Sequence, residues 1–336
     1  MAYYDSLKLE KGMYNIDFTK TLEKLDPSEN YEGTSLAGLD AFQRQLKRFD
    51  IKVNGKNSDV IEKFFRTSES AVLFPEYIKR SVQQGLIEES VLPDITATVT
   101  MIDGNDYRTI ELTEDEETVS DNEDDEEEEE TEGVKLPETI IKNKKTFVKI
   151  NKRGRVISSS YEALRLKRLD LFSVALKQIG ATIAREQLKD AVTVLAGSSE
   201  AIVSESEVFT YDDLIDLWGK LEPYNLSAIL CNNKMMQNIL ALDEMRDAQA
   251  GLNFQGTGKM VTPLGATLVR ASSVEDNHVI GIDKICALEM VQAGEIIIDY
   301  DKLIDKQLER IAISSSCGFA PVFNDAIKII NYSSIS

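Results

Sequence analysis

Cysteine and histidine are scarce in this sequence of 336 residues, and each scarcity excludes a kind of chemistry. The cysteines, Cys231, Cys286 and Cys317, are widely spaced and form no Cys-x-x-Cys pair, so neither a zinc site nor a disulfide framework is expected. The one histidine, His278, lacks the partners that a catalytic triad or a His-rich metal site requires. We therefore predict reduced thiols, a surface turn residue at His278 and no cofactor.

Long apolar runs are also lacking. No uninterrupted stretch approaches the ~20 apolar residues that span a bilayer, so no membrane segment is expected. The first residues, MAYYDSLKLEKGMYNIDF, have no basic region followed by an apolar core, so no secretory signal is expected. Apolar residues still make up 42% of the chain, which predicts a mostly folded protein with room for two compact units.

The net charge is −20 at pH 7, and most of it is concentrated in one run. Glu111–Glu132 holds 15 acidic residues and no basic one, which leaves about −5 for the rest of the chain. The simplest interpretation of this run is a disordered, self-repelling loop tip. A chain this acidic is poorly suited to direct binding of nucleic acid phosphates.

Two kinds of short pattern suggest ligand sites, and each has a simpler explanation. Gly256–Lys259 lacks the earlier glycine and the following Ser or Thr of a phosphate-binding loop, so a mobile loop is predicted. Acidic triplets suggest a divalent cation, but they also occur where a helix start or a solvated edge accommodates negative charge. The triplets are Asp212, Asp213 and Asp216, and Asp299, Asp301 and Asp305.

The longest periodic segment runs from Ser159 to Leu195. It opens with a Ser-x-x-Glu capping box at Ser159 and Glu162 and contains no proline. Its apolar residues recur at spacings of three, four or their sums, which predicts one face of a helix roughly 55 Å long. The stripe consists of Leu169, Phe172, Leu176, Ile179, Ile183, Ala191 and Leu195. Gly180 in its middle allows a bend or a break.

Two β segments flank the acidic run. Ile95–Leu112 alternates apolar and polar residues, and strand character returns in Thr146–Ile157 around a turn at Lys152–Gly154. Together they predict a hairpin arm with a disordered tip. Residues 1–34 are polar and predict an extended arm, and Ser35–Phe49 has the periodicity of a helix.

Beyond the long helix, helices and short strands are mixed without a strict βαβ order, so the fold class is α+β. A helix begins at Thr210 and stops before Pro223, Leu226–Cys231 forms a buried strand, and a second helix covers Asn232 to about Arg246. Short strands follow toward the C-terminus.

This order of parts resembles the major capsid proteins of tailed phages, the Hong Kong 97-type fold. The family has an entry segment of the form aliphatic-x-Pro-Glu-x-Ile, here Leu73–Ile78, followed by an extended β loop (the E-loop) and a long spine helix. A Tyr-Asp-Asp-Leu type of helix opens its axial domain, here Tyr211–Leu214. Pro263–Gly265 matches a turn before a strand, and Phe319–Ile327 matches a strand that returns to the peripheral domain.

The resemblance implies a division of the chain into arm, loop and two domains. The expected parts are an N-terminal arm (1–70), a peripheral-domain entry segment (71–94), the E-loop (95–157) with its acidic tip (111–132), the spine helix and linker of the peripheral domain (158–209), the axial domain (210–309) and return strands of the peripheral domain (310–336).

The resemblance also implies a structural protein and not an enzyme. It implies self-assembly into hexamers and pentamers of an icosahedral shell, the phage head or virion, which encloses double-stranded DNA without sequence-specific binding. Because no long coiled-coil region precedes the entry segment, scaffolding is expected from a separate protein, with a portal as a further partner. Assembly is expected in the bacterial host cytoplasm.

Basic residues of the E-loop are the candidates for contacts between subunits. They are Lys142, Lys144, Lys145, Lys149, Arg153 and Arg155. They lie in Lys135–Arg155, which has eight Lys or Arg against Glu138 alone, so an acidic tip could rest on the basic ribbon of a neighbouring subunit. In some relatives a loop lysine is cross-linked to an asparagine of the next subunit, for which Asn324 is a conceivable acceptor.

Two functions from other classes stay open at this point. One is an encapsulin-like compartment of the same fold, which would hold cargo enzymes and not DNA. The other is a soluble enzyme with an acidic insertion, although the sequence shows no cluster of nucleophile, base or metal ligands.

Overall fold

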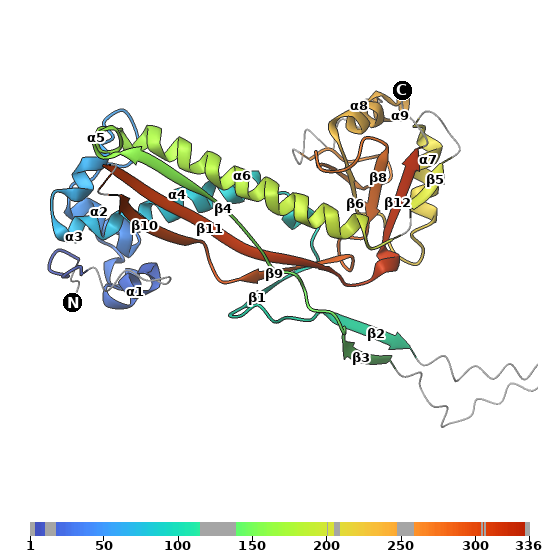
Figure 1. Ribbon diagram of the computed structural model, residues 1–336, viewed down its shortest axis with the longest axis horizontal. Coiled ribbons are helices and arrows are strands. Elements are labelled where there is room, and N and C mark those ends of the chain that lie inside the picture. Colours follow the sequence, from blue (N-terminus) through green and yellow to red (C-terminus); the bar gives the residue numbers. More distant parts are fainter. Residues whose placement is uncertain are drawn as a thin grey trace, which may run out of the picture. The chain divides into compact units, whose positions relative to one another are not determined.

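The computed structural model describes residues 4–10, 18–114, 139–199, 201–204, 209–246, 259–303, 305 and 307–332. The chain divides into two compact units. Unit 1 comprises residues 1–92, 151–190 and 292–317, and unit 2 comprises residues 93–150, 191–291 and 318–336. The mixed helices and strands confirm the predicted α+β class (Figure 1).

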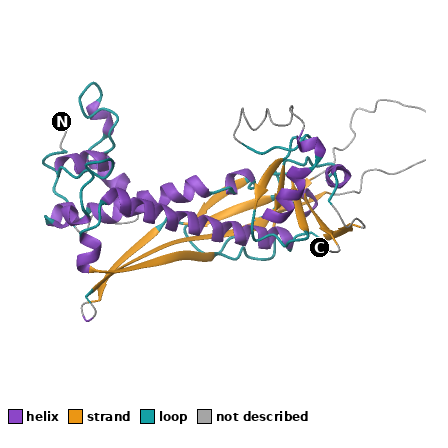
Figure 2. Cartoon of the chain, turned by 90° about the horizontal axis from the view of Figure 1, so that it is seen from above, coloured by secondary structure: helices purple, strands orange, loops and turns teal. Residues whose placement is uncertain are grey.

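Unit 1 combines helices with a group of long strands. Its helices are α1 (Phe18–Leu25), α2 (Ala41–Arg48), α3 (Ser68–Ala71), α4 (Leu73–Glu89), α5 (Tyr161–Arg165) and most of α6 (Leu169–Ala196). Its strands are β4 (Asn151–Ser160), β10 (Ile297–Leu303) and β11 (Leu308–Pro321), whose last residues belong to unit 2. β11 pairs antiparallel with β4 and with β10, and the helices (purple in Figure 2) cover one face of these strands.

The long helix forms as its apolar stripe predicts, but it begins later than expected. Leu169, Phe172, Leu176 and Ile183 of α6 are all buried in the core of unit 1. The first predicted turn is a separate helix, α5, and its N-cap is Ser160 and not Ser159. The chain changes direction between α5 and α6 because the backbone of Lys167 and Leu169 bonds to the segment Asp59–Ile61.

α6 continues through Gly180 without a break, and this glycine permits close contact with α4. A Cβ at Gly180 would lie 2.1 Å from the Val82 carbonyl oxygen, and one at Gly85 would lie 2.1 Å from the Lys177 carbonyl oxygen. Each glycine therefore lets the backbone of the other helix approach, which is the main reason for glycine inside a packed helix.

The N-terminal region corrects a prediction. Residues 18–34 are not an extended arm, because Phe18 and Leu22 of α1 are fully buried and Tyr31 is 3% exposed. α1 packs against α2, whose N-cap Asp40 forms a complete capping box with Gln43. The predicted helix at Ser35–Phe49 exists from Ala41 onward.

Unit 2 is built on a five-stranded sheet with the order β5-β12-β8-β6-β7. These strands are β5 (Ala201–Ser204), β12 (Ile327–Tyr332), β8 (His278–Ile282), β6 (Ala228–Cys231) and β7 (Thr267–Arg270). Helices α7 (Tyr211–Gly219) and α8 (Asn233–Ala241) supply apolar side chains that pack with the sheet, and α9 (Asp243–Arg246) follows. The fully buried strand at Ala228–Cys231 and both helices were predicted.

The domain boundaries need two corrections. β12 pairs with β8 and β5, so the last strand belongs to the sheet of unit 2 and does not return to the peripheral part as predicted for 310–336. β10, which was predicted within the axial domain, belongs to unit 1. The partners of β12 lie far away in the sequence, whereas β10 forms a hairpin with β11, which in turn pairs with the distant β4.

The predicted E-loop contains β1 (Thr98–Ile102), β2 (Ile110–Glu114) and β3 (Thr139–Asn143) in unit 2. The predicted turn at Lys152–Gly154 is wrong, because these residues lie inside β4 and pair with β11. A glycine is needed there since a Cβ on Gly154 would lie 2.2 Å from the Ile313 carbonyl oxygen. Most of the acidic run, residues 115–132, lies outside the described residues.

Candidate functional site

β2 and β3 form a two-stranded antiparallel ribbon in which Leu112 lies opposite Ile141 and Ile110 lies opposite Asn143. Because opposed residues of an antiparallel pair share a face, Ile110, Leu112 and Ile141 lie on the same side of the ribbon. Their exposed fractions are 41%, 36% and 69%. We call these three side chains the ribbon face.

This ribbon lacks the apolar cover that strands need. An isolated two-stranded hairpin is marginally stable in water, and independent stability takes a third strand or a packed helix. Contiguous exposed apolar surface is characteristic of a binding surface. The ribbon face is therefore suited to contact with another molecule.

A buried carboxylate fixes the root of the ribbon. Glu289, on β9 (Leu288–Ala293), is 6% exposed. Its Oε1 accepts hydrogen bonds from Thr100 at 2.5 Å and Tyr107 at 2.7 Å, and its Oε2 accepts one from Thr109 at 2.6 Å. Burial and the bond to Glu289 raise the pKa of Tyr107, so its phenol keeps the proton that it donates. Three donors satisfy the charge that burial would otherwise penalise.

A half-buried ammonium holds the other strand of the ribbon. Lys144 Nζ donates to the carbonyl oxygens of Pro321 at 2.7 Å and Val322 at 3.3 Å. Burial lowers the pKa of this lysine. The backbone adds bonds from Lys144 N to Thr109 O and from Val148 N to Tyr107 O. Lys144 therefore ties β3 to the end of β11.

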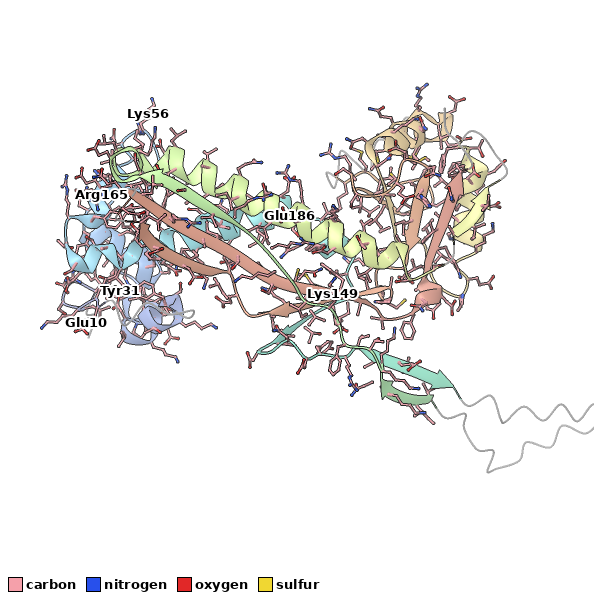
Figure 3. The ribbon with its side chains drawn as sticks, in the orientation of Figure 1. Glu10, Tyr31, Lys56, Lys149, Arg165 and Glu186 are labelled. Atoms are coloured by element: carbon pink, nitrogen blue, oxygen red, sulfur yellow. The ribbon has the colours of Figure 1, made fainter. Side chains whose placement is uncertain are left out.

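The structure separates the candidate contact residues into two groups. Arg153 forms a two-point ion pair with Asp190, with distances of 2.8 and 2.5 Å, and this bond raises the pKa of Arg153. Arg155 pairs with Glu186 at 2.7 Å (Glu186 is labelled in Figure 3). With Lys144, these arginines are engaged inside the chain. The exposed lysines, for which contact with another subunit stays a prediction, are Lys142, Lys145 and Lys149.

Asn324, the conceivable cross-link acceptor, opens a short 3-10 helix. It lines a hollow of about 460 Å³ together with Lys144 and Lys149. A cross-link between subunits stays a prediction.

The other sequence candidates are explained by local contacts. Asp213 is the N3 residue of the capping box of α7 and accepts bonds from Thr210 N and Oγ1, which agrees with the helix-start interpretation. Lys259 pairs with Asp94, whereas 256–258 lie outside the described residues. His278 begins β8 and its Nδ1 lies 3.2 Å from Glu275.

Among the described residues, no group of three or more His, Cys, Asp or Glu side chains is arranged to hold a metal ion. Among the same residues, no helix combines the length and apolar content needed to cross a membrane. Burial raises the pKa of Cys231 and of Cys317 to about 12, which suits unreactive thiols.

Sequence reasoning missed Glu289 and the ribbon face. No local pattern marks Glu289, because its three donors lie 180 to 189 residues away in the sequence. The alternation of Ile110 and Leu112 about Glu111 does mark a strand with an apolar face. Only the structure shows that this face is exposed among the described residues.

Solved structures provide the remaining comparison. No protein-family model and no curated protein matches this sequence. The crystal structure of a virus-like particle from Pyrococcus furiosus matches with a TM-score of 0.52 and 11% identity, covering 76% of this chain and 98% of that one. The structure titled Gordonia phage Cozz matches with a TM-score of 0.51 and 12% identity, covering 73% and 87%. The capsid of an empty GTA particle matches with a TM-score of 0.52 and 13% identity, covering 73% and 90%.

At such low identity these matches establish the fold alone. They cover 73–76% of this chain, and they agree with the α+β fold predicted from the sequence. The chain therefore has the α+β capsid fold of the Hong Kong 97 type.

Proposed function

We propose that this chain is the major capsid protein of a tailed phage. In this proposal it assembles with itself into hexamers and pentamers of an icosahedral shell, the virion head, around double-stranded DNA. It performs no catalysis and needs no cofactor. A separate scaffolding protein and a portal would take part in assembly in the bacterial host cytoplasm.

The ribbon face is the observation that carries the proposal. Ile110, Leu112 and Ile141 are exposed on a ribbon that the described residues of the chain do not cover. Stable interfaces bury on the order of 800 Å² per partner, and a protruding ribbon adds area that a compact surface does not reach. The shell fold of the structural neighbours supports another copy of the chain as the partner.

The charge of the chain suits enclosure of DNA without tight binding. With a net charge of −20, the protein has no general attraction for phosphates that would immobilise packaged DNA.

An encapsulin-like compartment remains the second candidate. The virus-like particle from Pyrococcus furiosus is matched over 98% of its length, so this chain contains nearly all of that fold. The contents of purified particles distinguish the two functions. Nuclease-protected DNA supports the phage head, and a packaged enzyme supports the compartment.

The test is assembly of the purified full-length chain, measured by sedimentation velocity and negative-stain microscopy, with and without co-expressed scaffolding protein. Closed shells are expected for the wild type. The double variant Leu112→Ser/Ile141→Ser is expected to remain in small species, because it removes most of the ribbon face. Asn143→Ser is the matched control on the same face, since it removes no apolar area, and it is expected to assemble. A wild-type chain that stays monomeric under all these conditions contradicts the proposal.

A further inference from the structure

A second exposed apolar surface lies at the turn between α5 and α6 in unit 1. Leu166, Leu171 and Val174 have exposed fractions of 69%, 64% and 62%. We call these three side chains the corner patch. Other apolar residues of α6, such as Leu169 and Phe172, are buried in the core of unit 1, so α6 has apolar side chains on two sides here. An amphipathic helix that packs only against its own core needs one apolar face, so the second is available to a partner.

The backbone of the corner is already bonded within the chain. Lys167 N donates to Leu164 O at 3.1 Å, and its own carbonyl oxygen accepts from Ile61 N at 2.9 Å. Leu169 N donates to Asp59 O at 2.8 Å. A partner therefore cannot bind here as an added strand, and it must cover the patch with side chains. A helix suits this role, because its own backbone groups are bonded within the helix.

The corner patch also has the form that a partner helix needs. Leu171 and Val174 are three residues apart, so they project from the same side of α6. Leu166 is the C-cap of α5, just before α6 begins. A partner helix packs on such a surface with apolar residues at spacings of three and four.

A basic loop is held beside the patch. The Arg168 guanidinium donates to the carbonyl oxygens of Gly55 and Lys56, each at 3.1 Å. Figure 3 shows Lys56 and Arg165 at the same end of unit 1 as α5. The position of Lys56 next to α6 is therefore fixed by the chain itself.

The charges around the corner patch are mainly positive. Arg168 is balanced by Asp170 at 2.8 Å. Lys56 and Lys167 are exposed and form no ion pair with another described residue. The one carboxylate of α5, Glu162, is also exposed and offsets part of this charge. The corner thus presents apolar side chains beside two exposed ammonium groups.

An occupant of this surface needs apolar side chains and negative charge. We propose that the corner patch is the docking site for an amphipathic, acidic helix of a separate protein. Its apolar stripe would cover the corner patch, and its carboxylates would lie near Lys56 and Lys167. Burial of the aliphatic groups provides the attraction, and the two ammonium groups select an acidic partner. This inference goes beyond the proposed function, because the partner is not another copy of the chain.

Within the described part of this chain, α7 is a competing occupant. It exposes Ile215 (42%) and Trp218 (53%) beside Asp212 and Asp216. Lys220 is exposed at the end of α7 and carries the same charge as the corner lysines, which disfavours the contact. A separate helix with acids on both flanks of its apolar stripe therefore fits the corner better than α7 of a second copy.

Peptide binding to the purified full-length chain tests the docking. The probe is a fluorescent peptide of about 18 residues, long enough to form a helix, with leucines at spacings of three and four and glutamates on both flanks. Leu171→Ser/Val174→Ser is expected to weaken its binding at least tenfold, measured by fluorescence anisotropy. Ile87→Ser is the matched control, since Ile87 is 65% exposed on α4 of the same unit, and it is expected to bind as the wild type does.

Charge reversal supplies an independent measurement. Lys56→Glu/Lys167→Glu is expected to weaken binding of the acidic peptide about tenfold at low salt, and less at high salt where charges are screened. Lys8→Glu/Lys47→Glu reverses two other exposed lysines of the same unit and is the matched control. A peptide with lysines in place of the glutamates is expected to bind at least ten times more weakly than the acidic one.

Four results would overturn the docking. They are no binding of the acidic peptide to the wild type, equal binding by the wild type and the Leu171→Ser/Val174→Ser variant, and tighter binding of the lysine peptide. The fourth is association between copies that is lost equally in that variant and in Ile215→Ser/Trp218→Ser, which would assign the patch to a second copy. Assembly of the chain without peptide tests the proposed function separately.

Discussion

The N-terminal helices and the β2–β3 ribbon differ in whether their apolar side chains are buried within the chain. Residues 1–34, which contain α1, were predicted to be an extended arm, and the ribbon was predicted to be part of a hairpin arm. In unit 1 the N-terminal helices bury Phe18 and Leu22 completely within their own chain. The ribbon leaves Leu112 and Ile141 exposed. The difference shows that a polar segment becomes self-sufficient when its few apolar and charged residues find partners in the same chain.

One ion pair shows how charged residues of the N-terminal helices find partners within the same chain. Arg44 and Asp26 are both fully buried, with Arg44 Nε 2.8 Å from Asp26 Oδ2. Arg44 also donates to Leu39 O and lies 4.2 Å from the centre of the Tyr31 ring, and Tyr31 donates to Asp26 at 2.5 Å. Burial, together with the bond to Asp26, raises the pKa of Tyr31. In the part of the chain that the structure describes, no comparable contact covers the ribbon face.

The largest loss of stability in unit 1 is expected from a substitution at the crossing of α4 and α6. Gly180→Leu places side-chain atoms where the Val82 carbonyl oxygen lies, so the two helices cannot keep their contact. We expect a loss of about 4 kcal/mol or more in the free energy of unfolding, measured by denaturant titration. Gly104→Ala is the control, since a Cβ there meets nothing within 4 Å. A Gly180→Leu variant as stable as the wild type would refute the close crossing.

Breaking the buried ion pair should have the next largest effect. Arg44→Met leaves Asp26 buried without its cation, and such losses are typically about 3 kcal/mol. The variant should unfold at lower denaturant, with increased amide exchange in α1 and α2. Arg310→Met changes an exposed arginine of the same unit and should leave the midpoint unchanged. Equal midpoints for the two variants would show that the N-terminal helices do not depend on this pair.

A smaller, local loss of stability is expected where Glu289 anchors the base of the ribbon. Glu289→Leu removes the acceptor of three hydroxyl groups, which should cost about 2 kcal/mol locally. Hydrogen exchange of the unassembled chain should increase in 98–112 and change little in unit 1. Glu111→Gln changes an exposed carboxylate of the same ribbon and is expected to have no effect. If exchange increased evenly over both units, Glu289 would be a general stability residue and not the anchor of the ribbon.

The smallest predicted effect depends on pH. Asp59 stabilises the loop before α3: although burial raises its pKa, the Lys52 N–H and the Lys63 ammonium hold that pKa below its usual range. A lowered carboxyl pKa contributes stability that is present above the unfolded value of about 4 and is lost as the pH falls through the folded value. Asp59→Asn should therefore be less stable than the wild type at pH 6, and the gap should close below about pH 4. Asp103→Asn, at an exposed position, should show no gap at either pH.

Local sequence patterns predicted some features of the fold correctly and could not predict others. The stripe from Leu169 to Ile183 is a local pattern, so it predicted the core face of α6 correctly. Gly180 was interpreted as a weak point because its partner, Gly85, lies on another helix and cannot be recognised locally. The last strand, β12, and the anchor at Glu289 were misplaced or missed for the same reason, since partners distant in the sequence determine them.

The central claim is that another copy of the chain covers the ribbon face. Hydrogen exchange of residues 110–114 and 139–143 in unassembled chains and in purified particles tests it most directly. We predict fast exchange of these amides before assembly and protection by at least a factor of ten in the particle, while the buried strand Ala228–Cys231 is protected in both. Slow exchange of the ribbon in the monomer, or equally fast exchange in both forms, would contradict the claim.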